Sequence, residues 1–279
     1  MPENTERFLV NGQEALDPAL LRDRGLHYGD GVFRTLAVYQ GQIQDLDGQL
    51  EHLRRDADKL AISAPLHLLR EDCEQLLATA GADNYALKII LTRGSSERGY
   101  ASPAQIQANR FLYLSAAPAN IQALASQGVR AVRNPYQLAH NETLAGIKHL
   151  NRLEQVLAMQ AQTQVAAPES ILFDVANNLI CASQSNLFFV VDERLCTPGL
   201  SRCGIAGRTR ARVLHMAEQL DINTEEGDYA EQTLRQASEV FICNSLIGIR
   251  PVIAFEDQLF PIGETTKQLQ ALLNLPALS

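Results

Sequence analysis

The stretch Ala145-Gly146-Ile147-Lys148-His149-Leu150-Asn151-Arg152-Leu153-Glu154-Gln155-Val156-Leu157-Ala158 changes character part of the way along. Gly146 interrupts any preceding strand or turn. Beyond it the apolar residues recur at a helical spacing, at Leu150, Leu153, Val156 and Leu157. This spacing predicts a helix that begins near Leu150, buries one face and runs to about Gln164.

Lys148 stands just before this predicted helix, beside a glycine and an isoleucine. A lysine that is partly removed from water favours its neutral amine, and a neutral amine can attack an aldehyde. The same local pattern also fits a solvated lysine at a helix start, which is the commoner situation in proteins. Lys148 is therefore a candidate nucleophile that needs support from the rest of the chain.

Composition favours an ordinary soluble globular protein. The 279 residues are 46% hydrophobic and 20% charged, which is typical of globular chains long enough for one large domain or two. The net charge of −8 argues against nucleic acid as a partner. The polar N-terminus, the lack of any run of membrane-spanning length and an odd count of five cysteines predict a cytoplasmic protein without disulfides.

Turn residues and hydrophobic alternation divide the first part of the chain into short elements. We expect a glycine-rich loop at 23–31, followed by a hairpin, two helices and two strands. Those elements are predicted at 32–39, 42–46, 50–61, 66–80, 85–92 and 110–115, with a strand at 7–12 before the loop. This order is typical of an α+β domain.

A small, proline-bearing segment after these elements is the predicted linker. We expect an N-terminal domain at 1–115, a linker at 116–122 and a C-terminal domain at 123–279. In the second domain, strands are predicted near 129–132, 170–174, 187–191, 240–243 and 252–255, with helices from about Arg210 to about Gln219 and from Thr265 to Leu273. The fold class is therefore α+β or α/β, in two domains.

Two loops carry residues that can bind anions. The turn from Gly204 to Thr209 opens a helix, where free amides and the helix dipole suit a phosphate. The loop from Arg93 to Tyr100 holds two arginines, which recognise carboxylates through paired hydrogen bonds. Each loop also fits a simpler interpretation, a tight helix entry and a solvated surface loop. The histidines show no metal-ligand spacing, so no metal site is predicted.

Taken together and in order, several motifs resemble one family, the fold-type IV pyridoxal-phosphate enzymes. This group includes branched-chain and D-amino-acid aminotransferases and 4-amino-4-deoxychorismate lyase. The resemblance covers nearly the whole chain. The motifs are Tyr28-Gly29-Asp30-Gly31-Val32-Phe33, Arg93-Gly94 with Arg98-Gly99-Tyr100, Gly146-Ile147-Lys148-His149-Leu150-Asn151-Arg152, Ser185-Asn186-Leu187-Phe188, Gly204-Ile205-Ala206-Gly207 and Cys243-Asn244-Ser245.

The resemblance implies two α/β domains with pyridoxal 5′-phosphate between them, and a homodimer. Lys148 would hold the cofactor aldehyde as a Schiff base and later move protons. The remaining implied contacts fall into two groups. Cofactor contacts are His52, Cys181, Asn186, Ile205, Ala206, Asn244 and Ser245, and substrate contacts are Tyr28, Arg93, Arg98 and Tyr100.

The run that follows Lys148 is close to that of the lyase branch, whereas aminotransferases usually carry a different run there. The resemblance therefore implies cleavage of aminodeoxychorismate to 4-aminobenzoate and pyruvate, a step toward folate. In that reaction Lys148 would take a proton from the ring carbon that bears the amine. Loss of pyruvate would then leave an aromatic ring, which gives the step a strong driving force.

Two residues depart from the family pattern. Cys181 stands where a glutamate usually pairs with the pyridine nitrogen, and His52 stands where an arginine usually grips the phosphate. A neutral thiol keeps the pyridine protonated less well than a carboxylate does, which weighs more against transamination than against an elimination that ends in an aromatic product. Two alternatives stay open: a D-amino-acid or branched-chain aminotransferase, and a homologue with impaired cofactor binding and another function.

Overall fold

The computed structural model describes residues 7–12, 20, 22–81 and 83–273. The chain divides into two compact units, the first made of Met1–Pro118 with Ile147–Asn151 and the second of Ala119–Gly146 with Arg152–Ser279. Sequence predicts one passage between domains at 116–122, and the first division falls there, after Pro118. The short return of Ile147–Asn151 into the first unit is not predicted, and it carries Lys148 with it.

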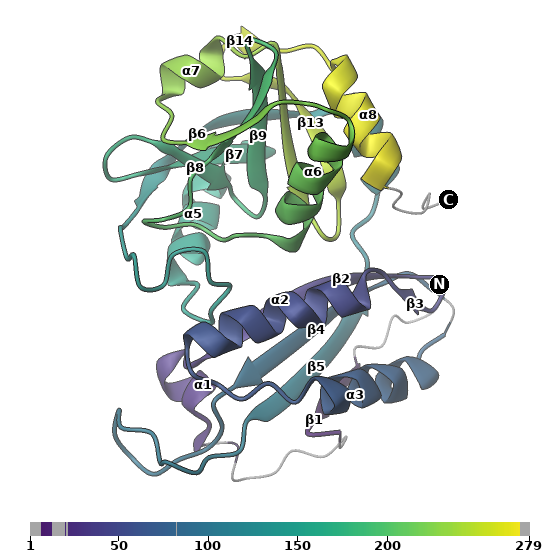
Figure 1. Cartoon of the computed structure of the whole chain (residues 1–279), viewed down its shortest axis with the longest axis vertical. Coiled ribbons are helices and arrows are strands. Elements are labelled where there is room, and N and C mark those ends of the chain that lie inside the picture. Colours follow the sequence, from purple (N-terminus) through teal and green to yellow (C-terminus); the bar gives the residue numbers. More distant parts are fainter. Residues whose placement is uncertain (1–6, 13–19, 21, 82, 274–279) are drawn as a thin grey trace. The chain divides into compact units, whose positions relative to one another are not determined.

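The first unit is an antiparallel sheet covered on one face by two helices (Figure 1). The strands pair in the order β1-β5-β4-β2-β3, and α2 and α3 lie over the sheet. Its elements are β1 (Arg7–Val10), α1 (Arg24–Tyr28), β2 (Gly31–Tyr39), β3 (Gln42–Ile43), α2 (Leu46–Lys59), α3 (Leu66–Ala78), β4 (Tyr85–Thr92) and β5 (Asn109–Ala116).

Alternation along β2 decides which side chains enter this core. Val32, Leu36 and Val38 are buried in the cluster formed with α2 and α3. Because side chains on one strand face alternate sides, Arg34 shares the inward face, and it is 98% removed from solvent. A buried guanidinium requires a partner, and this requirement shapes the candidate site described below.

The second unit contains a closed ring of strands. The strands β9, β12, β13, β6, β7 and β8 pair in this order, and β8 also pairs with β9. Closure removes the exposed edges that an open sheet would present. The strands of this unit are β6 (Val129–Leu138), β7 (Glu169–Asp174), β8 (Leu179–Ala182), β9 (Asn186–Val191), β10 (Arg194–Pro198), β11 (Thr224–Gly227), β12 (Glu239–Asn244), β13 (Gly248–Phe255) and β14 (Gln258–Leu259).

Helices pack around this ring (Figure 1). They are α4 (Ile121–Gln127), α5 (Leu153–Gln164), α6 (Arg208–Gln219), α7 (Glu231–Arg235) and α8 (Glu264–Leu273). Apolar residues of α6 and α8 form a core with β9 and β12, where the rings of Phe188 and Phe241 stack with centroids 5.1 Å apart. Stacked aromatic pairs of this kind add to the stabilisation from buried area.

The helix α5, which follows Lys148 in the chain, differs from the prediction in its start and in its buried face. It begins at Leu153 rather than Leu150, because 147–151 belongs to the first unit. Leu153 is 69% exposed and Val156 49% exposed, whereas Ala158 and Gln162 on the opposite side are buried. The prediction of a buried leucine face is therefore wrong for the described unit.

The physical reason lies in a polar network beneath α5. Asn134 donates to the Ala158 carbonyl at 2.9 Å and to the Ser170 hydroxyl at 2.7 Å. That hydroxyl in turn donates to the Gln162 side chain at 2.8 Å. A small alanine allows this close approach to the sheet, and satisfied hydrogen bonds make the buried amide acceptable.

Other differences concern short elements. Residues 24–28 of the predicted loop form the helix α1, where the Asp23 side chain accepts from the Gly25 amide at the N-terminus and Gly29 ends the helix with φ of 66°. Sequence analysis omits α4, α7, β8, β10, β11 and β14, all of which have at most seven residues. Among the described residues, no helix is long and apolar enough to cross a membrane.

Candidate active site

The lysine segment lies alongside the start of β2 in the first unit. The Phe33 amide donates to the Lys148 carbonyl at 3.0 Å, and the Leu150 amide donates to the Gly31 carbonyl at 2.9 Å. Gly31 also has no space for a side chain, because a Cβ there would lie 2.7 Å from Leu150 Cδ1. The backbone on both sides of His149 is therefore fixed to a strand edge.

The amide of Lys148 is held by a buried carboxylate. Asp56 on α2 accepts from this amide at 3.0 Å through Oδ2, and the same oxygen accepts from Arg34 Nη2 at 2.5 Å. Arg34 also donates to the His52 carbonyl at 3.2 Å. Burial raises the pKa of Asp56, and the charge of Arg34 and the hydrogen bond from Lys148 oppose that rise.

The side chain of Lys148 lies over an aromatic ring that it shares with a second lysine. Lys148 Nζ is 4.5 Å from the Phe33 ring centroid, and Lys88 Nζ is 5.0 Å from it. Thr35 is the direct partner of Lys88 in the β2–β4 register, so both ammonium groups belong to one face of the sheet. Lys88 is not among the site residues that the sequence predicts, although a lysine in the middle of an apolar strand is a visible signal.

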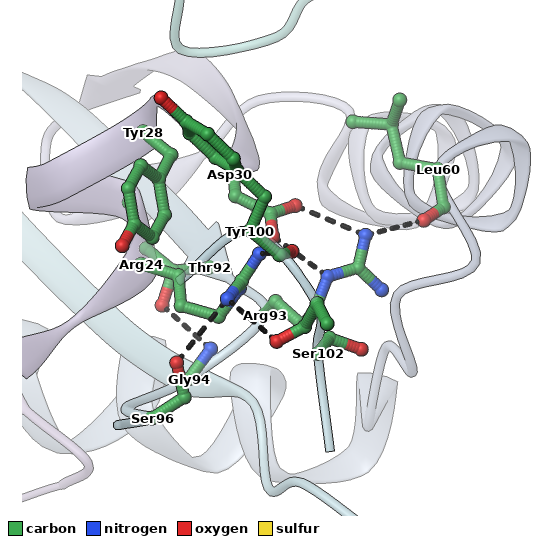
Figure 2. Close-up of polar contacts among 12 residues, drawn as sticks. Arg24, Tyr28, Asp30, Leu60, Thr92, Arg93, Gly94, Ser96, Tyr100 and Ser102 are labelled. Atoms are coloured by element: carbon green, nitrogen blue, oxygen red, sulfur yellow. Dashed lines mark hydrogen bonds and ion pairs between the residues drawn. The ribbon is translucent and has the colours of Figure 1, made fainter. Parts of the chain in front are cut away.

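Arg93, a predicted substrate contact, takes part in a dense polar cluster in the first unit (Figure 2). It donates to both oxygens of Asp30, at 2.8 and 3.0 Å, and to the carbonyls of Leu60 and Ala61. Arg24 donates to the same carboxylate at 2.8 Å. Burial alone would raise the pKa of Asp30, but the hydrogen bonds from Arg93 and Arg24 outweigh it and the pKa is lowered. Arg93 thus fastens its loop to the end of α2.

The other predicted substrate contacts lie further out in the same loop region. Arg24 donates to the Tyr100 carbonyl at 2.7 Å, and the Tyr100 ring lies 5.4 Å from that of Tyr28. The Gly99 amide donates to the Tyr28 hydroxyl at 3.3 Å. The Tyr100 side chain is 86% exposed, and Arg98 is also exposed. These side chains therefore border solvent on a backbone that Arg24 holds in place.

Cys181 and Asn186 face each other across a strand pair of the second unit. They are register partners in the β8–β9 pair, and Asn186 Nδ2 donates to the Ile205 carbonyl at 2.8 Å. Burial raises the pKa of the half-buried Cys181 thiol to about 12, and the neighbouring Cys203 and Glu169 add to this rise. At neutral pH this side chain is therefore an uncharged thiol and cannot replace a carboxylate charge.

The turn that carries Ile205 and Ala206 runs into the N-terminus of α6. The Gly146 amide donates to the Gly204 carbonyl at 3.1 Å, and the Ala206 amide donates back to the Gly146 carbonyl at 3.0 Å. Gly207 precedes the first helical residue, and no side chain caps the helix there. Helix N-termini in general favour anions, because their first amides have no partner within the helix.

Asn244 organises the turn after β12. Its side-chain oxygen accepts from the Leu246 and Ile247 amides, each at 2.9 Å, and its Nδ2 donates to the Ser185 hydroxyl at 3.1 Å. Ser245 is half-buried beside it. The Asn244 side chain thus stabilises the turn, and Ser245 lies within that turn.

The two units therefore hold the predicted residues in separate groups. Lys148, His52 and the residues of the 93–100 loop belong to the first unit, and Cys181, Asn186, Ile205, Ala206, Asn244 and Ser245 belong to the second. The first group offers an amine whose backbone is fixed, and the second offers a helix terminus suited to an anion.

Comparison with known proteins identifies the class. The class IV aminotransferase family model matches residues 31–255, and the chain belongs to this family. Over 276 residues it is 33% identical to aminodeoxychorismate lyase of Vibrio harveyi, covering 96% of this chain and 99% of that protein. The crystal structure of 4-amino-4-deoxychorismate lyase from Pseudomonas aeruginosa matches with 40% identity and a TM-score of 0.89, covering 95% of this chain and 97% of that one.

A more distant solved structure shares only the fold. It is a hypothetical aminotransferase from Mycobacterium tuberculosis in a PLP-bound form, with 19% identity and a TM-score of 0.80, covering 96% of this chain and 97% of that one. This match shows a shared fold, and a shared fold does not by itself identify an activity.

Proposed function

We propose that this protein is a pyridoxal-phosphate-dependent 4-amino-4-deoxychorismate lyase, which cleaves aminodeoxychorismate to 4-aminobenzoate and pyruvate. The observation that carries this proposal is the 33% and 40% identity, over nearly the full length, to two proteins named for that activity. The reaction needs no added water, since the two products together contain every atom of the substrate.

The residues present fit two polar groups of the cofactor, its aldehyde and its phosphate. Lys148 offers an amine on a backbone fixed by Asp56 and Phe33, and the uncapped N-terminus of α6 suits a phosphate. The fit at the ring nitrogen is weaker, because the Cys181 thiol is neutral. When bound, pyridoxal 5′-phosphate supplies an aldehyde for an amine and a ring that withdraws electrons.

In this proposal each group has a stated task. Lys148 would hold the cofactor at its aldehyde and, once the substrate amine has taken that place, its free amine would move the proton from the substrate carbon that bears the amine. The amides after Gly207, with Ser245 and Asn186, hold and orient the phosphate end, and His52 contributes to phosphate binding when protonated. The exposed Arg98 guanidinium pairs with a substrate carboxylate, with Tyr28 and Tyr100 beside it.

The neutral thiol favours the lyase over the aminotransferase alternative. Transamination depends on a ring that stores an electron pair, and a protonated ring nitrogen stabilises that pair. The lyase reaction gains an aromatic product instead and requires less of this stabilisation. Cys181 is therefore more compatible with elimination than with amino-group transfer.

A direct assay tests the proposal. Purified protein is incubated with aminodeoxychorismate, with and without added pyridoxal 5′-phosphate, while 4-aminobenzoate and pyruvate are followed together. We expect equal amounts of both products in the wild type, a visible absorbance band on cofactor addition, and loss of both signals in Lys148→Ala. The exposed Lys267 on α8 supplies the matched control, Lys267→Ala, which we expect to behave as the wild type.

Other outcomes would replace the proposal. Cofactor conversion by D-alanine or a branched-chain amino acid, without 4-aminobenzoate, would identify an aminotransferase. A protein that stays colourless with the cofactor and releases no product would indicate a homologue with another function.

For assembly and location, we propose a cytoplasmic homodimer, and sedimentation analysis measures the oligomeric state.

A further inference from the structure

The first unit contains two buried arginine–aspartate pairs of the same design. Arg34 on β2 pairs with Asp56 on α2 at 2.5 Å, and Arg110 on β5 pairs with Asp72 on α3 at 2.6 Å. All four side chains are at most 8% exposed. Each pair joins a strand of the sheet to the helix that covers it.

The pairs differ in what else the carboxylate holds. Both oxygens of Asp72 face Arg110, at 2.6 and 3.4 Å. Asp56 Oδ2 instead accepts from Arg34 and also from the Lys148 amide at 3.0 Å. Only one of these two pairs therefore reaches the lysine segment.

Stability alone gives little reason for the Arg34–Asp56 pair. Removing two charges from water costs free energy that their attraction roughly repays, and apolar residues of similar volume often replace such pairs without loss. A shared acceptor for the Lys148 amide is a function that an apolar pair could not perform. Arg34 balances the charge of this carboxylate and, through its second bond to the His52 carbonyl, is itself anchored to α2.

We propose that Asp56 is a positioning residue for Lys148 and that Arg34 holds the Asp56 carboxylate in the orientation that accepts the Lys148 amide. The Phe33 amide fixes the Lys148 carbonyl at 3.0 Å, and Asp56 fixes its amide, so the Lys148 Cα is held from both sides. From this fixed backbone the Lys148 side chain places Nζ 4.5 Å from the centroid of the Phe33 ring. The catalytic meaning of this arrangement rests on the proposed function, whereas the hydrogen bond can be tested without it.

The chain offers a sharp probe of this hydrogen bond, because it contains only four lysines. A sample labelled with ¹⁵N at lysine alone gives backbone amide signals from Lys59, Lys88, Lys148 and Lys267. Hydrogen exchange is then measured for each amide in the full-length protein. In the wild type we expect the Lys148 amide to be protected, and an unprotected Lys148 amide there would by itself overturn the proposal.

Two double variants make a matched comparison. Arg34→Met with Asp56→Leu removes the acceptor of the Lys148 amide, while Arg110→Met with Asp72→Leu removes the same chemistry elsewhere in the unit. We expect exchange at Lys148 to rise by about tenfold or more in the first variant and to stay within about twofold in the second. Equal changes in both variants, or none in the first, would contradict the proposal.

A single variant covers the possibility that the first double variant does not fold. Asp56→Asn preserves the shape and one neutral acceptor oxygen, so we expect a smaller rise in exchange at Lys148 with Lys88 unchanged. A loss of protection spread over all four lysines would indicate general loosening and would count against a positioning role.

Kinetics then connect the hydrogen bond to catalysis. We expect the Arg34→Met, Asp56→Leu variant to lose roughly ten- to a hundredfold in kcat for 4-aminobenzoate release while KM changes within about twofold. The matched Arg110→Met, Asp72→Leu variant keeps both values. If the wild type shows no lyase activity, the proposed function fails, but the exchange comparison still decides whether Asp56 holds Lys148.

Discussion

At the scale of single residues, environment decides what a side chain can do. Asp30 and Asp56 are both carboxylates near arginines, yet the pKa of Asp30 is lowered and that of Asp56 is raised. Burial acts on both, but Asp30 accepts hydrogen bonds from Arg93 and Arg24 together. At Asp30 the hydrogen bonds from two charged donors therefore outweigh desolvation, whereas at Asp56 desolvation prevails.

Cys181 gives a prediction at this scale. Although the side chain is only half-buried, a thiol pKa of about 12 leaves very little thiolate at pH 8, and the thiolate is the reactive form. We expect iodoacetamide at pH 8 to alkylate Cys181 at least about a hundredfold more slowly in the folded protein than in urea-unfolded protein. Peptide mass spectrometry measures both rates. Comparable rates would mean that the thiol is ionised and could pair with a protonated ring nitrogen.

At the scale of elements, a close approach of backbones holds the lysine segment. A Cβ added at Gly31 would lie 2.7 Å from the Leu91 carbonyl oxygen on β4 and 2.7 Å from Leu150 Cδ1. The backbone oxygen cannot move without distorting the β2–β4 pairing. Glycine at position 31 therefore permits the strand pairing and the docking of 147–151 at once.

Gly31→Ala tests this requirement. We expect the free energy of unfolding to fall by about 1–3 kcal/mol, as is usual when a well-packed site is overfilled. Urea denaturation monitored by circular dichroism gives the value. Gly81→Ala is the control, because its nearest neighbour is the Tyr85 hydroxyl at 3.6 Å, and a comparable loss there would remove the explanation.

The turn between β7 and β8, which leads to Cys181, depends on a single carboxylate. Asp174 accepts from the Asn178 side chain at 3.0 Å and from the backbone amides of Asn178 and Ala176 at 2.7 and 2.9 Å, and it contacts His140 at 2.9 Å. Burial alone would raise the pKa of Asp174, but these hydrogen bonds outweigh it and the pKa is lowered. The folded state therefore favours the charged carboxylate.

The sign of the pH dependence follows from this lowered pKa. Stability from the Asp174 carboxylate is present above the pKa of an unfolded aspartate and is lost as pH falls through the lower folded value. We expect Asp174→Asn to cost about 1–3 kcal/mol at pH 7, with the difference from wild type shrinking below about pH 3.9. Urea titrations at both pH values measure it, with the exposed Asp192→Asn as control, and a difference independent of pH would contradict this account.

At the scale of the whole molecule, each unit has its own hydrophobic core. One cluster of buried residues joins the first sheet to α2 and α3, and separate clusters fill the ring of strands and the space beneath α6 and α8. The proposed cofactor contacts come from both units. A ligand that requires both folded units stabilises both against unfolding.

Calorimetry with pyridoxal 5′-phosphate tests this coupling. At a concentration a hundredfold above Kd, binding to the native state alone adds about 2.7 kcal/mol. We expect the melting temperature to rise by roughly 5 °C or more, and any transition assigned to either unit to move with it. Pyridoxal without the phosphate serves as the control with a smaller shift. A melting temperature that ignores the cofactor would count against the proposed function.

The sequence by itself determined much of this protein. Hydrophobic alternation and turn residues predicted the longer strands and helices, because burial on one face leaves a periodic trace in the chain. The ordered motifs indicate the family, and the run after Lys148 resembles that of the lyase branch. Cys181 and His52 could be recognised as departures from the family pattern, because both lie in motifs with fixed spacing.

Only the tertiary structure decided which partners these residues have. The leucine pattern at 150–157 predicted the wrong buried face of α5, because long-range hydrogen bonds among Asn134, Ser170 and Gln162 hold the opposite face against the sheet. Arg34, Asp56 and Lys148 are far apart in sequence, so no local pattern predicts the carboxylate that they share. Long-range pairing is created by the folding of the sheet onto its helix, and that pairing places the lysine.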